Sequence, residues 1–76
     1  MICRKIFAER LTELRKQKSI TMKELSNAIN MTKAAVGNLE NEYRSPSLET
    51  IVSLADFFNV SIDYLVGRTD KPEINK

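Results

Sequence analysis

The sequence predicts an all-α domain of five helices, and three observations support this prediction. Apolar residues recur at spacings of three and four, the period of a helix with one buried face. Only two Gly and two Pro interrupt the 76 residues. Ser, Thr and Asn stand where helices are expected to begin and end. The predicted helices cover residues 4–17, 22–29, 33–41, 48–58 and 62–66.

The first two helices are joined by a short polar segment. Phe7, Leu11 and Leu14 are placed on the inner face of the first helix. Thr21 and Glu24 match a T-x-x-E capping box. In this motif the Thr hydroxyl accepts a backbone N–H of the first turn, and the Glu carboxylate accepts the backbone N–H of the Thr. The second helix therefore begins near residue 22, and its buried stripe contains residues 25 and 29. It ends before residue 30, an Asn, which tolerates the left-handed backbone of a sharp turn.

The third helix follows this turn after very few residues, so the two helices must pack closely. Thr32 is expected to cap it. Its inward face holds Val36, Leu39 and Glu40. The opposite face is small and polar, and it holds Lys33, Ala34, Gly37, Asn38 and Asn41.

The fourth and fifth helices are separated from the third by Pro46, which disfavours helical backbone in the residue before it. The fourth helix has an apolar stripe at helical spacing and ends at Asn59. Ser61 is expected to cap the last helix and Gly67 to close it. The residues expected to point inward are Leu48, Ile51, Leu54, Ala55 and Phe58 in the fourth helix, and Ile62 and Leu65 in the fifth.

The stretch from Thr21 to Pro46, TMKELSNAINMTKAAVGNLENEYRSP, resembles the helix-turn-helix of the lambda-repressor-like (Xre/Cro) family of DNA-binding regulators. The resemblance continues on both sides, through FAERLTELRKQKSIT before it and PSLETIVSLADFFNVSIDYLVG after it, so that it covers roughly residues 4–67. It implies a compact five-helix DNA-binding domain at residues 1–67. The remaining residues 68–76 are polar and lack apolar periodicity, which predicts a flexible C-terminal tail.

Composition excludes several other classes of protein. The chain contains no His and one Cys, so neither a catalytic constellation nor a metal site is expected, and no cofactor is implied. No apolar run approaches the roughly 20 residues that span a bilayer, and the basic start lacks the apolar centre of a signal peptide. Cys3 cannot form an internal disulfide. We therefore expect a cytoplasmic protein that is not an enzyme.

The net charge of +2 is unevenly distributed along the chain. Residues 1–44 contain nine Lys or Arg and five Asp or Glu, whereas residues 45–67 contain three acidic residues and no basic ones. The segment with the third helix is therefore basic, which suits a polyanion. A solvated surface with chance clustering of charge explains the same distribution.

The outward face of the third helix is expected to read bases in double-stranded DNA. Lys33 could donate to guanine O6 or N7, and Asn38 could pair with adenine N6 and N7. Ala34 offers a methyl group to thymine. Gly37 costs about 1 kcal/mol relative to Ala inside a helix, which close approach of the backbone to DNA would justify. Lys33 contacting only phosphate, a solvated Asn38 and neutral drift at Gly37 are the alternatives.

Phosphate contacts are assigned to residues around the same helix. The family commonly places a Gln at the start of the second helix, where this chain has Met22, so the backbone N–H groups there and Lys23 remain for that role. Glu42 replaces the family's usual glycine after the third helix. The phosphate-binding candidates are Met22, Lys23, Thr32, Asn41, Tyr43 and Arg44.

The resemblance also implies an internal ion pair between Arg15 and Glu40, linking the first and third helices, although the residues alone would allow two separate surface charges. One domain reads few base pairs, so a homodimer on a two-fold operator is expected, most simply as a repressor. The candidate dimer surface comprises Phe57, Val60, Tyr64 and Val66, with burial in the core as the alternative. A competing function is an antitoxin or protein-interaction module that binds a partner protein through this surface.

Overall fold

The computed structural model describes residues 3–74 as five α-helices joined by short connections. Within that range there is no β-strand, as the all-α prediction required. The second and third helices each end one residue earlier than predicted. The helices are α1 (Arg4–Gln17), α2 (Met22–Ala28), α3 (Lys33–Glu40), α4 (Leu48–Phe58) and α5 (Ile62–Val66).

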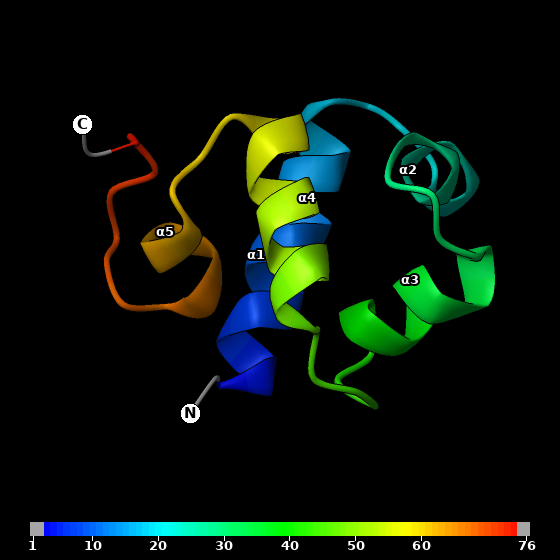
Figure 1. Ribbon diagram of the computed structural model, residues 1–76, viewed down its shortest axis with the longest axis horizontal. Coiled ribbons are helices and arrows are strands. Elements are labelled where there is room, and N and C mark those ends of the chain that lie inside the picture. Colours follow the sequence, from blue (N-terminus) through cyan, green and yellow to red (C-terminus); the bar gives the residue numbers. More distant parts are fainter. Residues whose placement is uncertain (1–2, 75–76) are drawn as a thin grey trace.

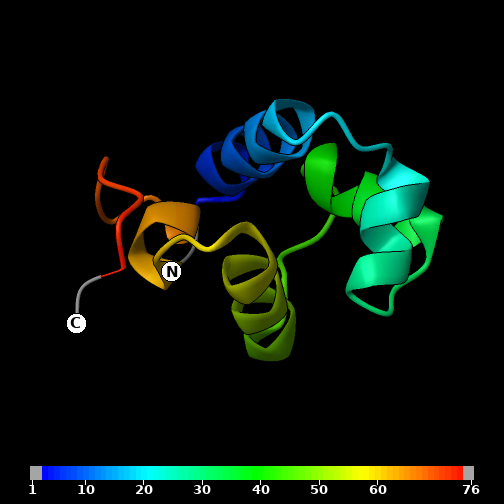
Figure 2. The same ribbon diagram turned by 90° about the horizontal axis from the view of Figure 1, so that it is seen from above.

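The helices are arranged around the α1–α4 pair. In Figure 1, α4 lies in front of α1 at the centre of the molecule, and in the view from above in Figure 2 the two helices lie apart, with α1 above α4. In both views α2 and α3 lie together at one end, while α5 and the following segment lie at the other. The helix that is expected to read DNA is therefore far from the C-terminal segment.

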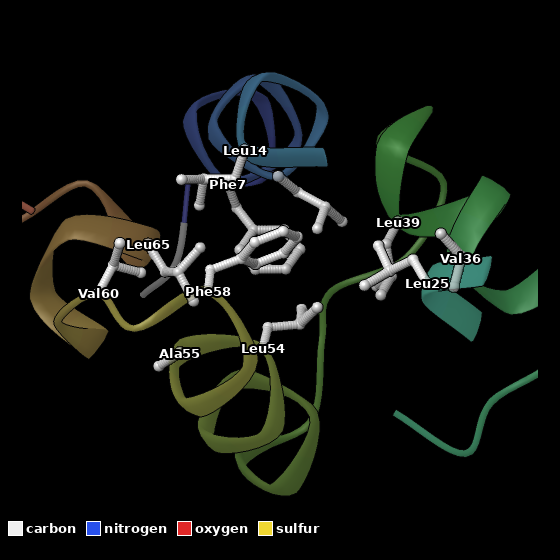
Figure 3. Packing of buried hydrophobic residues seen from close by; sticks show 11 residues of the cluster. Phe7, Leu14, Leu25, Val36, Leu39, Leu54, Ala55, Phe58, Val60 and Leu65 are labelled. Carbon is white, nitrogen blue, oxygen red and sulfur yellow. The ribbon is translucent and has the colours of Figure 1, made fainter. Parts of the chain in front are cut away.

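One hydrophobic core connects the two ends. Phe7, Leu54 and Phe58 lie between α1 and α4 in Figure 3. Leu25 extends this core toward α2 and α3, and Leu65 extends it toward α5. Burying each such side chain contributes roughly 1.5–3 kcal/mol. The largest fully buried side chains are Phe7, Leu11, Leu25, Leu54, Leu65 and Val36.

Side-chain caps define where the helices begin, and left-handed residues define several of the turns. The Thr21 hydroxyl accepts the Glu24 N–H at 3.1 Å, and a Glu24 carboxylate oxygen accepts the Thr21 N–H at 2.9 Å, which completes the predicted capping box. The hydroxyls of Thr32, Ser47 and Ser61 cap the next three helices. Positive φ angles occur at the predicted turn residues Asn30, Asn59 and Gly67.

Two residues assigned to the core are exposed instead. Leu48 retains 72% of its accessible surface and Ile62 retains 42%. Each is the first residue of its helix. Because helical side chains tilt toward the N-terminus, the first side chain lies beyond the end of the helix rather than over the core. Helical spacing therefore identified the buried residues inside both helices, but it does not apply to the first residue of either helix.

The C-terminal segment, residues 68–74, which was predicted to belong to a flexible tail, forms hydrogen bonds with the domain. It contains no helix, yet Arg10 of α1 donates from Nη1 to the carbonyls of Tyr64 and Thr69. Its Nη2 lies 3.0 Å from a carboxylate oxygen of Asp70. The Arg10 guanidinium also lies over the Tyr64 ring, 4.3 Å from its centroid. The Ser61 N–H donates to the carbonyl of residue 72 at 2.8 Å, which holds the segment beside α5.

Candidate nucleic-acid interface

The turn between α2 and α3 is held by backbone hydrogen bonds and a left-handed residue. Asn30 has a φ of 58°, as expected at this position. The Met31 N–H donates to the carbonyl of Ser26 at 2.8 Å. Ser26 is buried, and its hydroxyl donates to the carbonyl of Lys23 at 2.7 Å. These bonds satisfy the backbone groups at the end of α2 and direct the chain into α3.

Helix α3 has one face in the core and one face turned outward. Val36 and Leu39 are buried and contact the core cluster. Lys33 and Ala34 are exposed, and Asn38 is partly exposed. These three are the proposed base readers that carry side chains, and they share the outward face. Such a face, held in place from behind, is what insertion into a major groove requires.

Asn41 is engaged within its own helix. Its side-chain amide donates to the carbonyl of Gly37 at 2.9 Å, and its backbone N–H donates to the same carbonyl. The amide therefore satisfies the last turn of α3. The prediction that Asn41 binds phosphate did not include this internal bond.

The other phosphate candidates differ in what surrounds them. Lys23, Tyr43 and Arg44 are exposed, with Tyr43 retaining 73% of its surface. The Thr32 hydroxyl accepts the Ala35 N–H at 3.0 Å as a helix cap. Glu42 adopts a left-handed φ of 66°, the backbone for which the family usually supplies a glycine. The chain therefore forms a left-handed turn there without a glycine.

Met22 lies between α2 and the outward side of α3. It is partly buried, and its thioether sulfur lies 4.0 Å from the point where a Cβ on Gly37 would stand. A thioether cannot donate a hydrogen bond to a phosphate oxygen. Any phosphate contact of Met22 would therefore come from its backbone N–H, while its side chain packs against the edge of the hydrophobic core.

Arg15 and Glu40 form the ion pair that positions α3. Arg15 Nε lies 2.7 Å from Glu40 Oε2, and Arg15 Nη2 lies 3.2 Å from Oε1. The Glu40 side chain is 4% exposed and that of Arg15 is 14% exposed. The hydrogen bonds that Arg15 donates to Glu40 raise the pKa of its guanidinium above the ordinary value, although burial acts in the opposite direction. Arg15 therefore stays charged throughout the physiological pH range.

Two further groups complete this pair, and the sequence interpretation missed both. The Thr12 hydroxyl donates to Glu40 Oε1 at 3.1 Å, and Arg15 Nη1 donates to the carbonyl of Ile20 at 2.9 Å. Thr12 lies three residues before Arg15, on the same face of α1, so helical spacing could have indicated it. The Ile20 carbonyl carries no side-chain signal. Together these bonds connect α1, α3 and the segment that leads into α2.

A profile of the helix-turn-helix family HTH_3 matches residues 11–65, which is more than half of the chain. The chain belongs to the lambda-repressor-like helix-turn-helix family. An uncharacterised HTH-type transcriptional regulator of Bacillus subtilis, YobD, is 38% identical over 68 residues, which are 90% of this chain and 61% of that relative. The chain spans between about half and three fifths of the length of the first curated relatives it matches.

Two solved structures share the fold of this helix-turn-helix domain. The restriction-modification controller protein C.AhdI of Aeromonas hydrophila superimposes with a TM-score of 0.75 at 29% identity, over 82% of this chain and 94% of that one. The P22 c2 repressor, solved with a synthetic operator, has a TM-score of 0.77 at 24% identity, over 80% and 92% of the two chains. The latter likeness establishes the fold alone.

The candidate dimer residues of this helix-turn-helix domain are more buried than expected. Val60 is 7% exposed and belongs to the core, so its assignment to a surface was wrong. Phe57 and Tyr64 are partly buried and pack against the same core, and Val66 is also partly buried. Val60 directly follows the left-handed residue that ends α4, and this reversal turns it back toward Ala55, whose carbonyl accepts its N–H. The large apolar residues with the greatest exposure on α4 and α5 are Leu48, Val52 and Ile62.

Two negative observations apply to residues 3–74. In that range His, Cys, Asp and Glu side chains form no group of three or more that could hold a metal ion. None of the helices there combines the length and the apolar character needed to cross a bilayer.

Proposed function

We propose that this chain is a sequence-specific double-stranded DNA-binding transcriptional regulator, which acts as a homodimeric repressor on a two-fold operator. The observation that carries this proposal is the presentation of α3. Val36 and Leu39 anchor one face of α3, the largely buried Arg15–Glu40 pair fixes its orientation, and the opposite face is turned outward. Because the chain belongs to the helix-turn-helix family, insertion of α3 into DNA is the function that this geometry supports best.

Three exposed cations at the α2–α3 end are available for contacts with phosphate, although the carboxylates of Glu24 and Glu42 are exposed at the same end. Lys23, Lys33 and Arg44 are exposed on or beside these helices. The acidic residues Glu49 and Asp56 are exposed on α4. Favourable phosphate contacts and counterion release would therefore occur at the end that presents α3. Within this surface, we assign base contacts to Lys33, Ala34 and Asn38. We assign contacts with the DNA phosphates to Lys23, Arg44 and Tyr43.

The size of the domain supports binding as a dimer. Two-fold operators place half-sites about 34 Å apart, and the longest dimension of this domain is 30 Å. Two copies side by side would therefore reach successive major grooves on one side of the duplex. With Val60 assigned to the core, we place the dimer surface on the exposed apolar residues Leu48, Val52 and Ile62, together with the exposed edges of Phe57, Tyr64 and Val66.

The experiment that tests the proposal is selection of bound duplexes from a random DNA library, followed by affinity measurements over a salt series. We expect a two-fold sequence to be enriched, with specific binding that persists at salt concentrations where random DNA is released. Sedimentation velocity on the selected duplex should give two protein chains per DNA. Failure to enrich any two-fold sequence, with binding that vanishes as salt rises, would refute specific regulation.

One observation favours the second candidate function, a protein-interaction module. Leu48 and Val52 are one turn apart on α4 and both are exposed, which provides an apolar surface for another protein. Homodimerisation and binding of a partner protein both use such a surface. A chain that remains monomeric at high concentration, enriches no DNA sequence and forms a complex with the product of a neighbouring gene would support this second function.

A further inference from the structure

We propose that Met22 is a specificity-determining residue that contacts the methyl group of a thymine in the major groove. This inference rests on the proposed binding of DNA through α3. It assigns to the first residue of α2 a part in reading sequence, in place of the phosphate role that its position suggested.

The placement of the Met22 side chain carries the inference. Its sulfur lies 4.0 Å from the position of a Cβ on Gly37, and apart from the two adjacent residues no other side chain of residues 3–74 comes within 4 Å of that position. Gly37 belongs to the outward part of α3, because it lies four residues after Lys33 and three after Ala34. The absence of a side chain at Gly37 thus leaves the thioether beside the residues that are proposed to read bases.

The chemistry of the thioether selects the group it can recognise. Methionine is apolar, flexible and polarisable, and its sulfur is at most a weak hydrogen-bond acceptor. Phosphate oxygens and the polar edges of guanine, cytosine and adenine therefore gain little from it. The thymine methyl is the one methyl group on the base edges of the major groove. An A·T pair that offers its adenine to Asn38 also presents such a methyl in the same groove.

The test uses the full chain and a duplex recovered by selection from random DNA. Each thymine of this duplex is replaced in turn by deoxyuridine, which removes only the methyl group, and the dissociation constant is measured by fluorescence anisotropy. We expect one thymine per half-site at which the wild-type protein loses about fourfold in affinity, the value for one buried methyl-sized group. Met22→Ala and Met22→Gln should bind the thymine and uracil duplexes equally at that position.

Met31→Ala is the matched control. Met31 is also a partly buried methionine that packs against the core, but its sulfur lies 3.9 Å from the Thr50 hydroxyl on α4. This variant should keep the fourfold preference for thymine. Met22→Gln retains a side chain of similar length, so it serves if Met22→Ala does not fold by circular dichroism.

The outcomes separate this inference from the proposed function. If the selected duplex is bound specifically and both Met22 variants keep the preference for thymine over uracil, the inference is wrong and the proposed function stands. If no sequence is enriched by the wild-type protein, both are wrong.

Discussion

Replacing Gly37 by Ala should stabilise the protein and weaken its binding to DNA. Gly37 is the fifth of the eight residues of α3 and does not have a positive φ angle, so the helix itself does not require glycine. An added Cβ would meet only the sulfur of Met22 among the side chains of residues 3–74, at 4.0 Å, which is ordinary van der Waals contact. The packing of the domain therefore gives no reason for a glycine here.

The expected magnitude follows from helix propensity. Ala is about 1 kcal/mol more favourable than Gly inside a helix. For a domain of this size, that difference raises Tm by about 4–8 °C. If the α3 backbone lies against the bases, the added methyl group must displace the duplex. We then expect the affinity for the selected operator to fall by about tenfold, which corresponds to about 1.4 kcal/mol.

Thermal unfolding by circular dichroism measures the first effect, and anisotropy with the selected duplex measures the second. Ser53→Ala is the control, because Ser53 is exposed in the middle of α4 and Ala is the better helix former there. It should raise Tm slightly and leave the affinity for DNA unchanged. A higher Tm for Gly37→Ala with unchanged affinity would refute close approach of the backbone to DNA. An unchanged Tm would refute the propensity argument.

Three further predictions concern other parts of the domain. Glu40→Ala should lower the free energy of unfolding, measured in urea, by about 3–5 kcal/mol, because the largely buried Arg15 guanidinium loses its counter-charge. A loss below about 1 kcal/mol would show that the pair is effectively solvated. Asn38→Ala should relax preference at one base position, whereas Arg44→Ala should weaken binding to all sequences and reduce the salt slope by about one; a reversed pattern would exchange the two roles. Arg10→Ala should release the C-terminal segment and speed amide hydrogen exchange at Ser61, and unchanged exchange would contradict this attachment.

The order and bounds of the helices could be predicted because local chemistry determines them. A capping box depends on two residues three apart, and a left-handed turn depends on one residue that tolerates it. Thr21, Asn30 and Asn59 act in the structure as these rules require. Core positions followed from helical spacing in the interior of each helix. The prediction was wrong at Leu48 and Ile62, the first residues of α4 and α5. Their side chains tilt toward the N-terminus of the helix and so lie beyond its end, although their spacing matches the buried face.

Contacts between distant segments could be predicted only where both partners carry a chemical signal. Arg15 and Glu40 are oppositely charged and occupy positions that the family resemblance indicates, so their pairing could be anticipated. Arg10 donates instead to the backbone carbonyls of Tyr64 and Thr69, more than fifty residues away. Every residue has a carbonyl, so no side-chain pattern in the sequence marks these acceptors.

The same distinction explains why the scaffold is better determined than the residues that read DNA. Val36, Leu39 and Glu40 are recognised by what they contact inside the domain. Lys33 and Ala34 are exposed, so in the function we propose the groups that define their roles belong to the DNA. Substitution on this face should change sequence preference with little change in stability. A stability screen alone would therefore find the residues that hold α3 and miss those that read the operator, which only binding to altered duplexes can identify.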